Sequence, residues 1–157
     1  MIYFFAREAK GHGVPEVMEA VALRGGVIRK RVVAIKTLAS AISIGVGGSV
    51  GREGPIVQIG SAIGSTIGQM LNVSPGRLRT LVGCGAAGGI AATFNAPIAG
   101  SMFALEVILG DFGLATFSPI VISSVTATAI SRAFLGDFPA FFVPSYSLVS
   151  AWESVSY

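Results

Sequence analysis

Gly51-Arg52-Glu53-Gly54-Pro55 places a carboxylate in a glycine-rich break between two long apolar segments, residues 32–50 and 56–73. Proline has a fixed φ and no N–H, which suits the first turn of a helix. We therefore expect a helix to begin here, with Glu53 at or just before its start. A helix N-terminus carries unpaired N–H groups and the positive end of the helix dipole, so it attracts anions. Glu53 is accordingly either a fixed cap of this helix or a tethered stand-in for a mobile anion.

The composition is typical of a membrane protein. Of the 157 residues 52% are hydrophobic and 12% are charged, against about 25% charged in ordinary soluble domains. The mean hydropathy is +0.75, and 21 glycines suit helices that pack closely in lipid. Because a soluble chain of this length could not hide so much apolar surface from water, we expect an all-α integral membrane protein.

The cations indicate membrane topology and not nucleic-acid binding. The net charge is +3, but most cations lie in two short connections, residues 24–31 and 77–79. The positive-inside rule places both connections on the cytoplasmic side. Residues 136–147 contain Asp137 but no Lys or Arg, so we expect this loop on the opposite side.

Glycine and proline breaks divide the chain into short helices. Residues 1–9 read as the tail of an earlier helix, and a last apolar helix is expected to open at Pro119 and to end near residue 135. Between them we expect helices at residues 16–23, 32–44, 56–71, 76–93 and 98–109.

These helices have two further features. Gly60, Gly64 and Gly68 recur every four residues and predict one smooth packing face. Several helices are shorter than the roughly 20 residues needed to cross about 30 Å of hydrocarbon. Short, interrupted apolar segments are typical of transporter sites built from broken helices.

Three breaks place a proline at the opening of a helix, after glycines or an asparagine: residues 11–15, 51–55 and 94–97. Each opening presents several free backbone N–H groups. Together they predict a site for a small anion that is held by dipoles without a full opposite charge, which allows both entry and release. The alternative is that they are ordinary proline-capped helix starts.

The same motifs carry a resemblance to a known family. In order and spacing they are similar to the signatures of the ClC family of chloride channels and chloride/proton antiporters, through Gly11-His12-Gly13-Val14-Pro15-Glu16, Gly51-Arg52-Glu53-Gly54-Pro55 and Phe94-Asn95-Ala96-Pro97-Ile98-Ala99-Gly100. Lys36 falls where the family carries a lysine in the helix before its gate. The resemblance implies an all-α fold of broken, tilted membrane helices. Residues 1–157 would form the central helices of the first inverted-repeat half, without the N-terminal helices and the second half.

The resemblance also implies a function and roles for single residues. Glu53 would be the gate, whose carboxylate occupies an anion site when closed and swings out or takes a proton to let anions pass. The transported ion would be chloride, with no cofactor and no metal, and the protein would be a multi-pass homodimer in a prokaryotic plasma membrane. The anion-binding residues would be Gly11, His12, Gly13, Val14, Pro15, Arg52, Glu53 and Gly54.

Two positions depart from the family pattern. His12 stands where the chloride-type loop usually has serine, and since imidazole can also donate to an anion, another preferred anion stays open. Val107 stands where antiporters often carry a second glutamate, and an apolar side chain cannot carry a proton. This favours a channel-like or differently coupled mechanism, with Glu53 as the proton-relay candidate. We expect the neighbouring Glu106 to be a buried helix acid bonded to a nearby loop.

Two other function classes compete with anion transport. Residues 45–51 look like a phosphate-cradling glycine loop, but no strand precedes them and no Gly-Lys-Ser/Thr follows, so we expect no enzyme. The second rival is a truncated piece that conducts nothing, because the family's pore also draws on an inverted second half. Within transport, the residues are compatible with both a channel and an antiporter.

Overall fold

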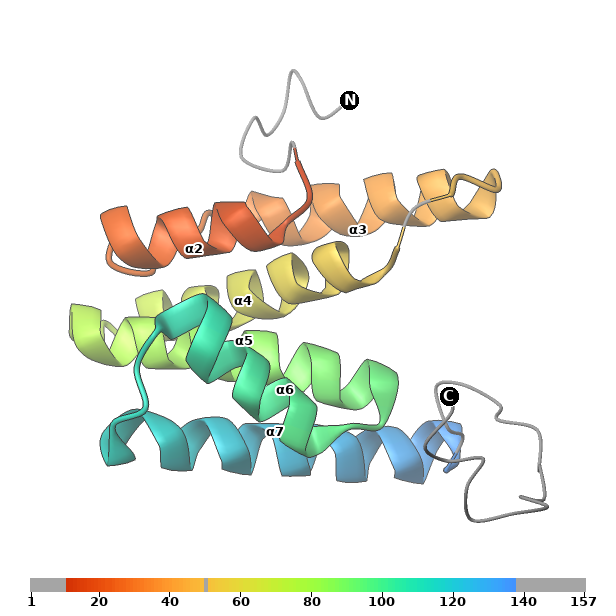
Figure 1. Cartoon of the computed structure of the whole chain (residues 1–157). Coiled ribbons are helices and arrows are strands. Elements are labelled where there is room, and N and C mark those ends of the chain that lie inside the picture. Colours follow the sequence, from red (N-terminus) through yellow and green to blue (C-terminus); the bar gives the residue numbers. More distant parts are fainter. Residues whose placement is uncertain (1–10, 50, 138–157) are drawn as a thin grey trace, which may run out of the picture.

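The computed structural model describes residues 11–49 and 51–137. These residues form helices and no strand (Figure 1), which confirms the predicted all-α class for this part of the chain. The helix tail expected in residues 1–9 and most of the loop expected at residues 136–147 lie outside the described residues. The elements are α2 Val14–Leu23, α3 Arg31–Gly45, α4 Glu53–Met70, α5 Pro75–Phe94, α6 Pro97–Phe103, the π-helix η2 Ala104–Leu109 and α7 Leu114–Leu135.

Helix α5 lies at the centre of the arrangement. It packs against α4, α6, η2 and α7, while α3 packs against α4, and α2 packs against both α4 and η2 (Figure 1). The core contains Val82 and Ala86 of α5 together with Val57, Leu105 and Ile120 from the helices around it. Much of this core is built from small side chains, so the helix backbones approach one another closely.

The closest approach is between α4 and α5, along the glycine face predicted from the sequence. A Cβ placed on Gly60 would collide with the carbonyl oxygen of Gly85, and one on Gly85 would collide with that of Gly60. A Cβ on Gly64 would meet the carbonyl oxygen of Leu81 in the same way. The predicted packing face is therefore confirmed, and direct backbone contact between membrane helices is what such glycine spacing permits.

The two cationic stretches lie side by side at one end of the molecule, but residues 77–79 belong to the first turns of α5 and not to a connection, which corrects that part of the prediction. A Cβ on Gly26 would come within 3.2 Å of the Arg79 nitrogen. The first connection is also attached to α4, because the Ser65 hydroxyl donates to the Gly26 carbonyl at 2.7 Å and accepts from the Ile28 N–H at 2.9 Å. Both stretches therefore lie at the same end of the helices, and their placement on the cytoplasmic side stays a prediction.

The start of α7 differs from the prediction. Pro119 was expected to open this helix, which is wrong: α7 begins at Leu114 and Pro119 lies inside it. The preceding loop is fixed against the first turn of the helix, because the Asp111 carboxylate accepts from the N–H of the N-cap residue Gly113 at 2.9 Å and from the Thr116 hydroxyl at 2.8 Å. The hydrogen bond from the Gly113 N–H, and to a lesser degree that from the Thr116 hydroxyl, lowers the pKa of Asp111 below its ordinary value.

Helix α7 is also the described element best suited to cross a membrane. It has 22 residues with a mean hydropathy of 1.5, and among the described helices it is the one long and apolar enough to span a bilayer by length and composition. Only 17% of its most apolar window is buried, so most of its side chains face away from the described part of the chain. The shorter apolar helix Pro97–Leu109 fits the predicted set of short segments.

Candidate anion site at two facing helix openings

The loop before α2 is fixed by two charged side chains. Glu16 folds back over the loop, and its Oε2 accepts a hydrogen bond from the Gly13 N–H at 2.7 Å. Lys36 of α3, which is 5% exposed, donates from Nζ to the Gly11 carbonyl oxygen at 2.9 Å and also attracts the Glu16 carboxylate. Gly13 has a φ of +98°, a conformation that favours glycine. The loop is thus held in a single, preorganised shape.

Glu53 is the first residue of α4, as the position of Pro55 predicted. The first backbone hydrogen bond of the helix runs from the Ile56 N–H to the Arg52 carbonyl at 3.1 Å, so the N–H groups of Glu53 and Gly54 have no partner within the helix. The exposed Glu53 carboxylate curls toward Gly51, where an added Cβ would collide with it. Within residues 11–49 and 51–137 no hydrogen-bond donor to this carboxylate is found, and the helix has no side-chain cap.

The openings of α2 and α4 meet backbone to backbone. A Cβ on Gly54 would collide with the carbonyl oxygen of His12, and a Cβ on Gly13 would collide with the carbonyl oxygen of Gly54. A side chain at either glycine would push the two loops apart. The structure therefore brings together the residues predicted to bind the anion: Gly11, His12, Gly13, Val14, Pro15, Arg52, Glu53 and Gly54.

The third opening lies apart from the first two. Helix α6 begins at Pro97 and packs against α5, η2 and α7. Its link to the α4 opening is the ring of Phe94, whose centre lies 5.2 Å from the guanidinium carbon of Arg52, a distance suited to a cation–π contact. The openings of α2 and α4 thus meet directly and the third is in indirect contact with them, while anion binding by these openings stays a prediction.

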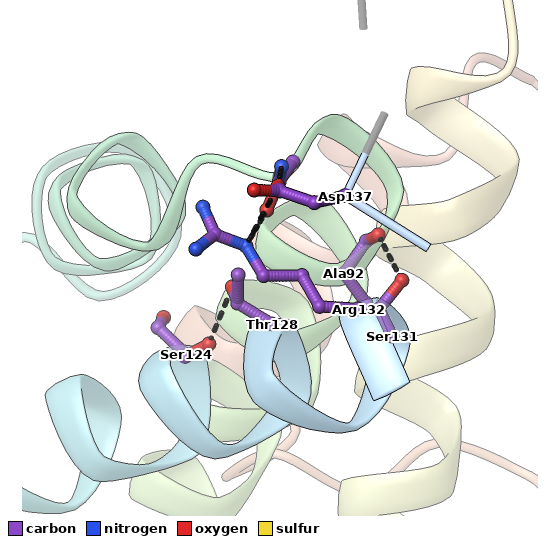
Figure 2. Close-up of polar contacts among 7 residues, drawn as sticks. Ala92, Ser124, Thr128, Ser131, Arg132 and Asp137 are labelled. Atoms are coloured by element: carbon purple, nitrogen blue, oxygen red, sulfur yellow. Dashed lines mark hydrogen bonds and ion pairs between the residues drawn. The ribbon is translucent and has the colours of Figure 1, made fainter. Parts of the chain in front are cut away.

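A polar cluster that was not predicted from the sequence holds this third opening. Asn95 ends α5 in the left-handed conformation, with φ 55° and ψ 36°. Arg132 Nε donates to Asn95 Oδ1 at 2.6 Å, and Asn95 Nδ2 donates to Asp137 Oδ1 at 2.7 Å. The Arg132 Nε also lies 3.2 Å from Asp137 Oδ1 (Figure 2). No local pattern could reveal this cluster, because it joins residues that are far apart in the chain.

Glu106 and Val107 lie on the wall of a separate, open cleft of about 870 Å³, together with Arg77 and Arg79. The expectation of a buried Glu106 is wrong, since its side chain is exposed. Leu105 and its neighbours turn inward to the core on the other face of η2, which leaves Glu106 directed outward. Val107 is half-buried and gives this wall an apolar side chain.

The two facing openings have the features expected of a site for a small anion. They offer unpaired backbone N–H groups and two positive helix-dipole ends, which favour a negative charge. Arg52 adds a cation beside the α4 opening, and Glu53 places a carboxylate at the first residue of the helix. In the described part of the chain, no group of three or more His, Cys, Asp or Glu side chains is placed to hold a metal ion.

The whole chain, residues 1–157, matches the family model described as voltage gated chloride channel. The chain belongs to the voltage-gated chloride channel family. This is the family that its three motifs resemble, so the predicted family is confirmed, and with it an integral membrane protein.

Similar curated proteins carry names from the same family. A putative chloride channel protein ClcB-like from Ralstonia nicotianae is 40% identical over 149 residues, which are 92% of this chain and 35% of that protein. H(+)/Cl(-) exchange transporters ClcA from Vibrio vulnificus and Vibrio cholerae are each 37% identical over 149 residues, 93% of this chain and 32% of the transporter. The chain thus spans about a third of the length of the curated relatives it matches.

Proposed function

We propose that this chain supplies half of a membrane pathway for chloride or a similar small anion, and that Glu53 is its gate. The observation that carries the proposal is the backbone contact between the openings of α2 and α4, with the exposed Glu53 carboxylate beside Gly51 at the start of α4. Membership of a chloride channel family supports chloride as the ion. The pathway needs no catalytic step and no cofactor.

The groups proposed to bind the anion differ in their roles. The Gly13 N–H is already donated to Glu16, so Gly13 shapes the loop while the anion is bound by groups that have no helical partner. These include the N–H groups of Val14, Glu53 and Gly54. In the closed state the Glu53 carboxylate occupies this position, and its departure or protonation admits the anion. Because these groups are dipoles, the anion is released readily.

Two modes of transport are compatible with this site. The apolar Val107 at the position of the antiporters' second glutamate favours passive, channel-like movement, and the relative from Ralstonia nicotianae is named as a putative channel. Chloride/proton exchange is the second candidate, because the Vibrio relatives are named as exchange transporters. In that mode Glu53 would carry the proton.

A multi-pass homodimer in a prokaryotic plasma membrane completes the proposal. It is supported by α7, whose outward face bears the exposed apolar side chains of Ile122, Val125 and Phe134. Such a face needs either lipid or a second subunit against it. Each subunit would hold its own pathway, with the remaining part of the site supplied by the rest of a full-length protein.

The test uses the full-length protein that contains this segment, reconstituted in liposomes and assayed for chloride efflux. We expect Glu53→Gln to remove the pH dependence of chloride flux while chloride efflux persists. The reason is that the glutamine amide, unlike the carboxylate, carries no charge at any pH of the assay. Glu19→Gln, on the exposed face of α2, is the matched control and should behave like the wild type. Loss of all flux from a normally folded Glu53→Gln protein would contradict the gate assignment.

The same liposomes separate the two modes. An outward chloride gradient should drive protons against their own gradient if the protein is an exchanger. A channel would move chloride with no proton movement, and this outcome would exclude the exchange mode.

A further inference from the structure

The cluster of Asn95, Arg132 and Asp137 sits at a point where the backbone makes an uncommon turn. Asn95 is one of two described non-glycine residues with a positive φ, and both ends of its side-chain amide are engaged. Its oxygen accepts from Arg132 and its nitrogen donates to Asp137. The amide is therefore held in one orientation, and the left-handed turn between α5 and α6 is held with it.

This turn is connected to the gate by two further contacts. Phe94 directly precedes Asn95. The guanidinium carbon of Arg52 lies 5.2 Å from the centre of the Phe94 ring. Arg52 is the N-cap of α4 and directly precedes Glu53. A rotation of the Asn95 backbone would move the Phe94 ring, and with it the surface on which Arg52 rests.

The attachment of α7 to α5 does not depend on the cluster. The Ser131 hydroxyl donates to the Ala92 carbonyl oxygen at 2.8 Å (Figure 2), and the Ser123 hydroxyl donates to the Cys84 carbonyl oxygen at 2.9 Å. These two bonds hold the helices together along their length. Arg132 and Asp137, with side chains 49% and 70% exposed, add little to that packing but fix the orientation of Asn95.

We propose that Arg132 and Asp137 are positioning residues for the gate, acting through Asn95, Phe94 and Arg52 on the closed position of Glu53. The proposal rests on the proposed function of Glu53. If the contacts of Arg132 and Asp137 with Asn95 are lost, the Glu53 carboxylate is held less firmly in its closed position. It then competes less well with the anion. The apparent KM for chloride should therefore fall.

The experiment is a double-mutant cycle in the full-length protein, measured as chloride flux into liposomes against chloride concentration. We expect Arg132→Gln to lower the apparent KM about twofold or more when Glu53 is present, and to leave it unchanged in the Glu53→Gln background. Arg132→Lys, which keeps a donor for Asn95, should restore much of the wild-type value. Arg77→Gln removes the same charge at the opposite end of the molecule and is the matched control.

Each outcome has one meaning. If Glu53→Gln alone leaves flux and its pH dependence unchanged, the proposed gate fails, whatever Arg132 does. If the gate is confirmed but Arg132→Gln shifts KM equally in both backgrounds, or in neither, the positioning role is overturned. Should Arg132→Gln not assemble, Asp137→Asn alters only an exposed charge and gives the same test, with the same dependence on Glu53 expected.

Discussion

At Gly54, a single missing side chain allows the openings of α2 and α4 to meet. Its Cα lies so close to the His12 carbonyl oxygen that even a methyl group would collide with it. Glu53 was predictable from the sequence because Pro55 marks the first turn of a helix. The contact with His12 was not predictable, because it depends on how α2 and α4 are placed relative to each other.

Gly54→Ala should therefore separate the two loops. We expect a loss of about 1–3 kcal/mol in the free energy of unfolding, as is typical of overpacking, together with strongly reduced chloride flux. Thermal unfolding and liposome efflux of the full-length protein measure the two effects. Gly76→Ala is the matched control, because nothing lies within 4 Å of an added Cβ there and alanine favours a helix by up to about 1 kcal/mol. A Gly54→Ala protein with unchanged flux would contradict the facing-loop site.

Lys36 contributes to the site from a different helix. Its ammonium is the donor to the Gly11 carbonyl oxygen, and Lys36→Met would leave that partly buried oxygen without this donor. An unsatisfied buried acceptor costs about 1–3 kcal/mol, and part of this loss should appear as weaker chloride binding because the α2 loop is less well fixed. Calorimetric titration of the full-length protein with chloride measures the Kd. The exposed Lys30, replaced by methionine, should leave the Kd unchanged, and equal effects at the two positions would disprove the role of Lys36.

At the scale of the element, the start of α7 shows which sequence signal is the stronger one. Pro119 is a helix-start residue by frequency, yet the helix begins earlier, where Asp111 binds the N-cap residue Gly113 and the Thr116 hydroxyl of the first turn. A proline inside a helix removes the hydrogen bond of its own N–H and its ring crowds the carbonyl four residues earlier, and α7 contains Pro119 all the same. An aspartate two residues before a glycine was a turn signal that could have been found in the sequence.

The two hydrogen bonds to the Asp111 carboxylate predict how the stability of the protein depends on pH. The pKa of Asp111 is lowered in the folded state, so its contribution is present above the unfolded pKa of about 3.9 and is lost as the pH falls through the folded pKa. Asp111→Asn should therefore lower the melting temperature of the full-length protein at about pH 7 and have less effect at about pH 3. Glu19→Gln is the control. If Asp111→Asn lowered the melting temperature by the same amount at both pH values, the Asp111 charge would not be what stabilises the start of α7.

At the scale of the whole molecule, the fold depends on the glycine seam, which is the close backbone contact of Gly60 and Gly64 of α4 with Gly85 and Leu81 of α5. Gly60→Val would force the helices apart, since its Cβ already collides with the Gly85 backbone. We expect a loss of about 3 kcal/mol or more, measured as melting temperature and yield of folded full-length protein. Gly45→Val, where the added Cβ meets nothing within 4 Å, should be tolerated. Equal stability of the two variants would contradict the seam.

The sequence predicted the class, the helix segments and the family, because glycine and proline positions, hydropathy and short motifs are local signals. It did not predict the cluster around Asn95 or the exposed Glu106, because these depend on which face of one helix meets another. The glycine seam was predictable in part. The four-residue spacing of Gly60, Gly64 and Gly68 was visible in the sequence, but the contact of this face with Gly85 of α5 became known only from the structure.

The contact of the His12 carbonyl with Gly54 also bears on how such a site can evolve. The backbone of residue 12 makes the contact, while its side chain is exposed and takes no part in holding the loops together. Residue identity at this position is thus free to drift without unfolding the scaffold. Under the proposed function, an exchange of serine for histidine here would change the groups that face the anion and would leave the backbone contact of Gly13 and Gly54 intact.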